Sequence, residues 1–502
     1  MRHSLAILLL TTGCLDSKVQ SDFNVQLVPV TPQGQAPIEQ AVELGVVIRG
    51  RDTQVITPGA ADVEGGSPPG LEATELEPID DAFIGLVGTD ELATLTAATV
   101  FSYGEAGPFT LATDNEPMDV SVLVAEAGRV GLLGTLAGDQ TALLASVAVS
   151  ANGDVYTFGG LDNGVPSDGI ARLTDLDAGD WSFQRIGTLP GGARVGMTAT
   201  VVDLNGQEAI LVTGGRADPA NTLQNANEAF LLTTEDGLTP WDGVSREARS
   251  GHTAVPLANG RVLLVGGFTN PDELDASPTA TFEVFDPGFQ VFNTGASPLP
   301  IPPTGFAAAD VGAEGVLLCG GHTTDADGNT VPTDVCTWIS PLGSVRDAPP
   351  LPLPVTGLAM AAVGERHVLA TGGIAGTLED GQTAPATSQV WLYTVASDSW
   401  QELDPLASPR AHHRAVPSPD GRIIVVGGVR NTNADGTVFD TPVECTEVYD
   451  PVARTIQEGG CQPVGSGLRP AVGAHPSHGA VVFSGDATPG TQFGFIPFPA
   501  PF

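Results

Sequence analysis

The chain has 502 residues, of which 63 are glycine and 41 are proline, and only 16% are charged. This length accommodates more than one domain, and the many turn residues without a long helical pattern predict an all-β protein. Acidic residues outnumber basic ones by 59 to 20, which gives a formal net charge of −39. A surface this acidic repels nucleic acid and anionic lipid headgroups, so we expect neither as a partner.

The first fourteen residues have the pattern of an export signal. An arginine precedes an apolar run that ends at Leu10, and small residues then lead to Cys14. The run is too short to span a bilayer. Gly13-Cys14 resembles the processing site of bacterial lipoproteins, in which the cysteine becomes the lipidated first residue. The resemblance implies an exported protein anchored to the outer membrane by lipid, on the periplasmic face or the cell surface. An ordinary signal peptide that carries a cysteine is the alternative.

Residues 15–22 are interpreted as a polar tether, and residues 23–128 as a separate small β domain. Alternating apolar residues near Val25, Val46 and Val122 predict strands, which are separated by clusters of Gly, Pro and Asp. We expect a β-sandwich similar to immunoglobulin-like or transthyretin-like domains. Its expected role is a stalk that holds the remainder of the chain away from the membrane.

A Gly-Gly pair recurs along the rest of the chain, each time after a short apolar run such as RVLLVGG or RIIVVGG. Six pairs recur at intervals of 52 to 55 residues, and we number the repeat units by them. A degenerate seventh copy stands at Ser484-Gly485. The six pairs are Gly159-Gly160, Gly214-Gly215, Gly266-Gly267, Gly320-Gly321, Gly372-Gly373 and Gly427-Gly428. A period near 50 residues with short strands is typical of propellers, in which each unit packs against its neighbours.

Each unit predicts four strands. In unit three, residues 252–265 predict two strands around the turn Asn259-Gly260, and residues 281–293 predict two more around Asp286-Pro287. The diglycine, an aromatic residue before Asp-Pro and a downstream tryptophan such as Trp400 resemble the kelch repeat. The resemblance covers residues 129–502. It implies a β-propeller and, by itself, no particular function.

The ends of the repeat region predict how the ring closes. Residues 130–136 align with the outer strand of unit one, whereas unit seven ends near Phe498 before an outer strand of its own. The strand at 130–136 is therefore expected to complete the last unit and to remove its open edge. This predicts a seven-bladed kelch-type β-propeller, at residues 129–502, preceded by the small β-sandwich domain. Six blades with a C-terminal tail are the alternative.

The four cysteines beyond Cys14 fall into two close pairs. These are Cys319 with Cys336 and Cys445 with Cys461. Each pair lies across an expected hairpin, and an oxidising compartment favours a disulfide in each. No CxxC or Cys/His spacing supports a metal-binding or reactive thiol.

Four units open with an arginine at the equivalent position, which in a propeller lies near the central channel. Convergent guanidinium groups are suited to an anionic ligand. The candidate ligand-binding residues are therefore Arg194, Arg249, His252, Arg410, His413 and Arg469. The competing interpretation is that an arginine here belongs to the kelch pattern and bonds neighbouring loops.

An acidic loop in unit four offers oxygen ligands of the kind that calcium prefers, at Asp325, Asp327 and Asn329. The loop lacks the full EF-hand spacing, and Asp, Asn and Gly are also ordinary turn residues. The sequence therefore predicts no metal or cofactor, and calcium at this loop stays open as the alternative.

The sequence favours a non-catalytic recognition or scaffold protein that binds a protein or glycan ligand through the loops at the propeller rim. We expect a monomer that contacts the membrane through its lipid only. The alternative is an enzyme that acts on a glycan or another anionic molecule through the arginines. Copper enzymes similar to galactose oxidase are disfavoured because strand packing accounts for the repeat tyrosines. The SxDxGxTW boxes of sialidases and the GxSxG elbow of serine hydrolases are absent.

Overall fold

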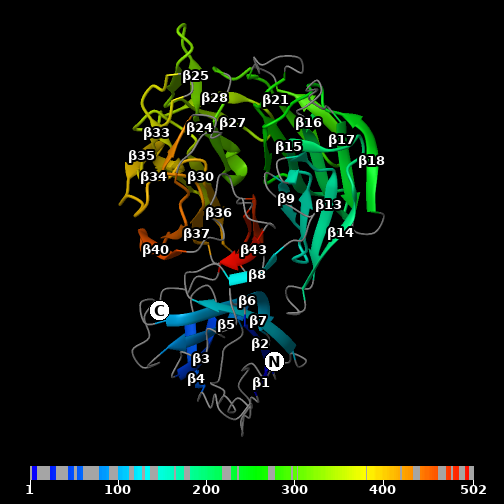
Figure 1. The fold of residues 1–502 in the computed structure, drawn as a ribbon, viewed down its shortest axis with the longest axis vertical. Coiled ribbons are helices and arrows are strands. Elements are labelled where there is room, and N and C mark those ends of the chain that lie inside the picture. The colour runs from blue at the N-terminus through cyan, green and yellow to red at the C-terminus, as the bar shows by residue number, and fades with distance from the viewer. Residues whose placement is uncertain are drawn as a thin grey trace.

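The computed structural model consists of β-strands and two short 3₁₀ helices, η2 (Gly312–Glu314) and η3 (Val395–Ser397), among the residues that it describes (Figure 1). Before residue 145 it describes the backbone of eight strands. After that point the described ranges are 145–162, 165–174, 181–217, 228–233, 237–269, 278–295, 298–301, 304–379, 382–418, 421–433, 441–461, 471–475, 479–484 and 492–496.

Each repeat unit forms an antiparallel sheet of four strands, and the described strands make seven such sheets. In unit three the order is β19 (Thr253–Pro256), β20 (Val262–Val265), β21 (Phe282–Asp286) and β22 (Val291–Thr294). The second strand carries the apolar run before the diglycine and is buried along its whole length. The four strands lie within the predicted ranges, except that β22 ends at Thr294, one residue past the prediction.

The other units follow the same order, from the first strand to the fourth. Units one, two and four contain β9 (Ser146–Val149), β10 (Val155–Phe158), β13 (Gly169–Thr174) and β14 (Ser182–Thr188); β15 (Arg194–Asp203), β16 (Glu208–Ala217), β17 (Glu228–Thr233) and β18 (Gly237–Val244); and β23 (Phe306–Asp310), β24 (Val316–Gly320), β27 (Cys336–Ile339) and β28 (Val345–Ala348). Units five, six and seven contain β30 (Ala359–Val363), β31 (His367–Thr371), β34 (Val390–Thr394) and β35 (Ser399–Glu402); β36 (Arg414–Pro417), β37 (Ile423–Val426), β39 (Cys445–Asp450) and β40 (Thr455–Cys461); and β41 (Ala471–His475), β42 (Gly479–Ser484), β43 (Gln492–Ile496) and β8 (Gly131–Thr135).

The first strands of the seven sheets contact one another in a closed cycle, from β9 through β15, β19, β23, β30, β36 and β41 back to β9. Between the last and first units, His475 Nε2 lies 2.8 Å from the carbonyl oxygen of Gly153. The fourth strand of unit seven is β8, which pairs antiparallel with β43 and stands at the predicted position 130–136. The arrangement is that of a β-propeller.

The hydrophobic cores lie between neighbouring sheets. Six described clusters join the units pairwise, from one with two to six with seven. Five of them draw on the second and third strands of both partners, and the cluster of units six and seven draws on β37, β39 and β42. A single unit therefore buries its apolar faces only when both neighbours are present, which is the reason that such repeats form rings.

The strands that precede β8 form another sheet, in the order β1-β2-β7-β6-β5-β3-β4. Their bounds are β1 (His3–Ile7), β2 (Phe23–Pro29), β3 (Glu43–Arg49), β4 (Gln54–Gly59), β5 (Ile79–Thr89), β6 (Val100–Leu111) and β7 (Met118–Glu126). β7 pairs in parallel with β2 through Val124, and with β6 at Ala125 and Glu126. The sandwich arrangement stays a prediction.

Part of the predicted export signal is described, as strand β1, whereas Cys14 and the tether at 15–22 lie outside the described residues. In the part of the chain that the structure describes, no helix is long and apolar enough to cross a membrane.

Candidate functional site

The diglycines form the joints between neighbouring units. In unit two, the N–H of Gly215 donates to the carbonyl oxygen of Arg249 in unit three at 2.9 Å, and in unit five Gly373 donates to Arg410 of unit six at 2.9 Å. In units one, two, four and five the first glycine lies against the carbonyl to which the second one donates, and a Cβ at Gly372 would overlap the oxygen of Arg410. The joint therefore explains both glycines of the pair, through a positive φ and a close backbone approach.

The side chains of Arg249 and Arg410 turn into their own sheets. Arg249 is 1% exposed, and its Nη2 lies 2.9 Å from Glu283 Oε1 while its Nη1 donates to the carbonyl of Gly266 at 3.0 Å. Arg410 is fully buried, with Nη2 2.7 Å from Glu447 Oε1. Its Nη1 donates to a diglycine carbonyl at 3.0 Å, in the same way as in unit three. Each cation thus has a buried carboxylate and a diglycine carbonyl as partners.

The two glutamates also hold the segment that enters each unit. Glu283 accepts hydrogen bonds from the N–H of Arg246 at 2.7 Å and of Glu247 at 3.3 Å. Glu447 accepts from the equivalent backbone groups of Ala407, at 2.7 Å, and Ser408, at 3.2 Å. The Glu–Arg pair therefore fastens the entering segment to the third strand of the same sheet.

Arg194 in unit two is also buried and pairs within its sheet. Its Nη2 lies 2.8 Å from Glu228 Oε2, and its guanidinium stands 5.1 Å from the centre of the Phe230 ring. Arg469 lies outside the described residues.

Arg194, Arg249 and Arg410 therefore each pair with a glutamate of their own sheet, and their binding of an anionic ligand stays a prediction. A buried cation needs a partner close to it, and in units three and six the third strand of its own sheet supplies one. The sequence signal that identifies this partner is a glutamate two residues before the strand aromatic, in Glu283-Val284-Phe285 and Glu447-Val448-Tyr449.

The two candidate histidines link neighbouring units. His252 Nε2 lies 2.8 Å from the Thr198 hydroxyl and 3.1 Å from that of Thr213, both in unit two. His413 Nε2 lies 2.8 Å from the Thr371 hydroxyl in unit five. Burial, with Arg249 adding to it, lowers the pKa of His252 to about 3. Burial and the nearby Arg410 lower the pKa of His413 well below its ordinary value. Both rings are neutral at physiological pH.

A second contact between neighbouring units connects their first strands, and it is made by backbone groups and not by arginine side chains. Two positions after the arginine, or after the equivalent residue in units four and five, stands a residue with a positive φ; in units two to six it is Gly196, Gly251, Gly305, Gly357 and His412. The N–H of Gly251 donates to the carbonyl of Gly196 at 2.7 Å, and that of His412 donates to Gly357 at 2.8 Å. His412 is buried and takes part in this second contact, between the first strands of units five and six.

The acidic loop of unit four is a hairpin turn. Its carboxylate at Asp325 accepts hydrogen bonds from the backbone N–H groups of Asp327 and Asn329, both at 2.9 Å, and from the Asn329 side chain at 3.0 Å. These bonds lower the pKa of Asp325. The carboxylate oxygens are thus engaged in the turn, and no group of three or more His, Cys, Asp or Glu side chains in the described residues is placed to hold a metal.

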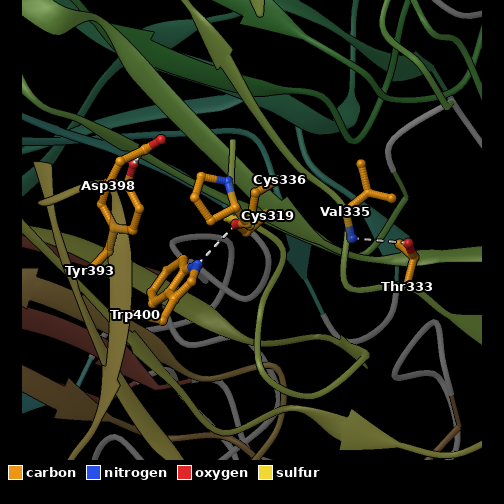
Figure 2. The surroundings of a disulfide bond; sticks show 8 residues. Cys319, Thr333, Val335, Cys336, Tyr393, Asp398 and Trp400 are labelled. Carbon is orange, nitrogen blue, oxygen red and sulfur yellow. Dashed lines mark hydrogen bonds between the residues drawn. A yellow bond between two sulfur atoms is a disulfide. The ribbon is translucent and has the colours of Figure 1, made fainter. Parts of the chain in front are cut away.

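The disulfide between Cys319 and Cys336 is present, as the sequence predicts. The two residues face each other in the register of β24 and β27, next to the Tyr393 and Trp400 side chains of unit five (Figure 2). Cys445 is disulfide-bonded too, and Cys461 is its register partner across β39 and β40. Each cysteine pair lies within a single sheet, the first in unit four and the second in unit six.

The loops between second and third strands of units four, five and six are joined into one surface, which we call the rim platform. Thr330 of unit four and Leu378 of unit five exchange backbone hydrogen bonds of 2.7 and 2.9 Å. Further along, β33 (Ala384–Pro385) of unit five pairs with β38 (Asn431–Thr432) of unit six. The platform also contains the hairpin of β25 (His322–Thr324) and β26 (Thr330–Pro332), and β25 lies at the top of Figure 1, away from the N-terminal sheet.

A small hydrophobic core supports the rim platform. Its buried members are Ile374, Leu378, Ala386 and Ala411, from units five and six. The surface above it is polar, with exposed threonines and acids such as Thr324, Asp327 and Thr383. An ordered loop surface with its own core is what a binding face requires.

A cleft of about 390 Å³ lies at the opposite end of the strands, between units two and three. Its charged residues already have partners: Glu208 accepts from the N–H of Ala151 at 2.8 Å, and Arg261 donates to Asp286 at 2.8 Å. Arg261 is thus already paired within its own sheet.

Comparisons with known proteins bear on the class. No family model matches the chain. The F-box/kelch-repeat protein SKIP4 of Arabidopsis thaliana is 32% identical over 114 residues, which are 22% of this chain and 27% of that protein. The chain thus matches about a quarter of the length of this curated relative. The solved structure of YjhT matches with a TM-score of 0.47 and 16% identity, over 64% of this chain and 99% of that one.

The diglycine repeats, the four-stranded sheets and the match to a kelch-repeat protein together define a class. The chain has a β-propeller fold, and its repeats are similar to the kelch repeat.

Proposed function

We propose that this protein is an exported, lipid-anchored recognition or scaffold protein that binds a protein or glycan ligand through the rim platform, without catalysis. The observation that carries the proposal is the joining of three neighbouring loops into one ordered surface with a core of its own. Conformational entropy lost on binding is smaller for such a preorganised surface than for separate loops.

The pairing of Arg194, Arg249 and Arg410 with glutamates inside their sheets favours the binding role over the enzyme alternative. Neither candidate histidine supplies an acid or base, since both are buried and bonded to threonines. No other cluster of titratable groups among the described residues suggests chemistry.

Export and anchoring are supported by the signal pattern and by the paired cysteines, which suit an oxidising compartment. We expect the mature chain to begin at Cys14 and to carry lipid there. Fractionation of cells that express the wild type or Cys14→Ala tests this, together with the mass of the N-terminal peptide. A Cys14→Ala protein that stays in the membrane fraction, with no lipid mass on the wild type, would contradict the anchor.

The binding site is tested by a screen of glycans and envelope proteins against residues 129–502. Asp327→Arg and Thr383→Arg each place a large cation on exposed positions of the rim platform. Val452→Arg is the matched control, because Val452 is 92% exposed at the turn after β39, at the other end of the strands. We expect ligands to lose binding to both platform variants and to keep it with the control. Ligands indifferent to all three substitutions would place recognition elsewhere.

A further inference from the structure

The described segment of the export signal occupies an edge of the N-terminal sheet. β1 pairs antiparallel with β2 along five residues, with Leu5 opposite Val25 and His3 opposite Leu27. On its other side β2 pairs with β7. β1 is therefore the outermost strand at this end of the sheet.

Processing at Cys14, on which this inference rests and which is part of the proposed function, removes β1. The backbone N–H and C=O groups of β2 that β1 had satisfied then lose their partners. An exposed edge strand is a template for another strand, and proteins usually protect such edges with charges, bulges or prolines. In the mature chain β2 becomes this edge.

β2 carries little of that protection. Its sequence, FNVQLVP, contains no charged residue, in a chain with 59 acidic residues, and its proline stands at the last position. A second copy of the chain is a poor occupant, because two chains with this excess of acidic residues repel one another. An uncharged strand from a different protein is not repelled in this way.

We propose that the β2 edge of the mature chain is a strand-addition site, which takes an extended, uncharged strand of a partner protein antiparallel to β2. The main-chain hydrogen bonds supply the affinity, as in other complexes formed by β-augmentation. The pairing of β1 in the unprocessed chain gives the direction and the register of such a strand.

Disulfide trapping with a peptide tests the site. The probe is the peptide of residues 1–8 with Leu5→Cys, and the protein is the chain from residue 15 onward with Val25→Cys. We expect the mixed disulfide to form about tenfold or more faster than with a scrambled peptide of the same composition and charge, because pairing raises the effective concentration of the two thiols. Ile56→Cys, in the strand β4 at the opposite end of the sheet, is the control position. Equal rates at Val25 and Ile56, or equal rates with the scrambled peptide, would overturn the proposal.

Backbone methylation separates strand addition from side-chain contact. In a β-strand, alternate N–H groups point to the same neighbour, so two probes are made with N-methyl groups on alternating residue sets. Methylation of the N–H groups that face β2 should abolish disulfide trapping, and methylation of the alternate set should leave the trapping rate unchanged. Equal trapping of the two probes would contradict strand pairing. Sedimentation of the mature chain should give a monomer, and a dimer lost on Val25→Pro would assign the edge to a second copy instead. The recombinant chain needs no processing, so these results are independent of the lipid-anchor test.

Discussion

At the scale of single residues, the buried Glu–Arg pairs are costly to break. Arg410 and Glu447 are both fully buried, and Glu447 also accepts backbone hydrogen bonds from the segment that enters unit six. A buried ion pair contributes little net stability compared with an apolar replacement, but removal of one partner leaves the other charge uncompensated. These arginines therefore stabilise the fold by compensating the charge of the buried glutamates.

We expect Glu447→Ala to lower the free energy of unfolding by about 3–5 kcal/mol, since it strands the Arg410 cation and two backbone N–H groups. Urea unfolding followed by tryptophan fluorescence measures the change. Glu314→Ala is the control, because Glu314 pairs with Arg346 across 3.7 Å at the surface and is 53% exposed. Its loss should cost less than about 1 kcal/mol. Similar effects for the two variants would show that burial of the pair does not matter.

The two interunit histidines make the ring sensitive to acid. Their folded-state pKa values lie below the ordinary value of 6.5, with His252 at about 3. Above pH 6.5 the rings are neutral in both states. As the pH falls below 6.5, the two histidines become protonated in the unfolded chain but stay neutral in the folded chain. The free energy of unfolding therefore decreases until the folded pKa is reached, by up to about 1.4 kcal/mol per pH unit for each ring.

The double variant His252→Gln/His413→Gln should therefore have a flatter dependence of unfolding free energy on pH between 6.5 and 4. Denaturant titrations at several pH values measure the slope, which is separate from any uniform loss of stability. Asp310 acts in the opposite direction, because burial raises its pKa to about 6. Asp310→Asn should accordingly steepen the loss in acid. An unchanged slope in the histidine variant would mean that the rings are protonated in the fold.

At the scale of elements, the diglycine is a joint between sheets. The second glycine donates to the next unit, and the first lies against the same carbonyl with a positive φ. Disulfides and hairpin turns act within one sheet, whereas this joint connects two. The regular spacing of the diglycines therefore records the regular contact between neighbouring units.

Gly372→Ala is expected to destabilise the protein by about 1–3 kcal/mol more than Gly376→Ala. Both glycines have a positive φ, so both substitutions introduce backbone strain of about 1–3 kcal/mol. A Cβ at Gly376 meets open space, whereas one at Gly372 overlaps the carbonyl oxygen of Arg410 in the next unit. Thermal and urea unfolding of the pair of variants measure the difference. Equal effects would leave strain alone as the cause and remove the role of the joint.

At the scale of the whole molecule, the ring closes by an exchange between distant parts of the chain. β8 precedes unit one in sequence and completes unit seven in space, where it pairs with β43. The first strands of units seven and one are also in contact. Closure protects β43 from an exposed edge and couples the N-terminal segment to the propeller.

A chain that begins at residue 129 keeps β8, whereas one that begins at residue 137 lacks it. We expect the shorter chain to unfold at a lower temperature and to self-associate, because β43 then presents unpaired backbone groups. Differential scanning calorimetry and sedimentation velocity compare the two. A monomeric shorter chain with an unchanged unfolding temperature would mean that β8 does not close the ring.

The sequence by itself determined the repeat, the order of strands within each unit, the closing strand and the cysteine pairing. These features depend on local patterns: apolar runs, turn residues such as Asn259-Gly260, and a hairpin register that places Cys319 opposite Cys336. Local patterns determine which residues form neighbouring strands because the side-chain period of a strand is two. The kelch architecture followed from them.

Only the tertiary structure decided where the arginines point and which loops join. The sequence places Arg249 at the start of its unit, but the direction of its side chain depends on the buried carboxylate of Glu283. That carboxylate comes close only when the sheet is assembled. The neutral state of His252 depends on burial against the neighbouring unit, and the rim platform depends on contacts between loops such as Thr330 with Leu378. These interactions join residues that are distant in the chain, and the packing of neighbouring sheets brings them together.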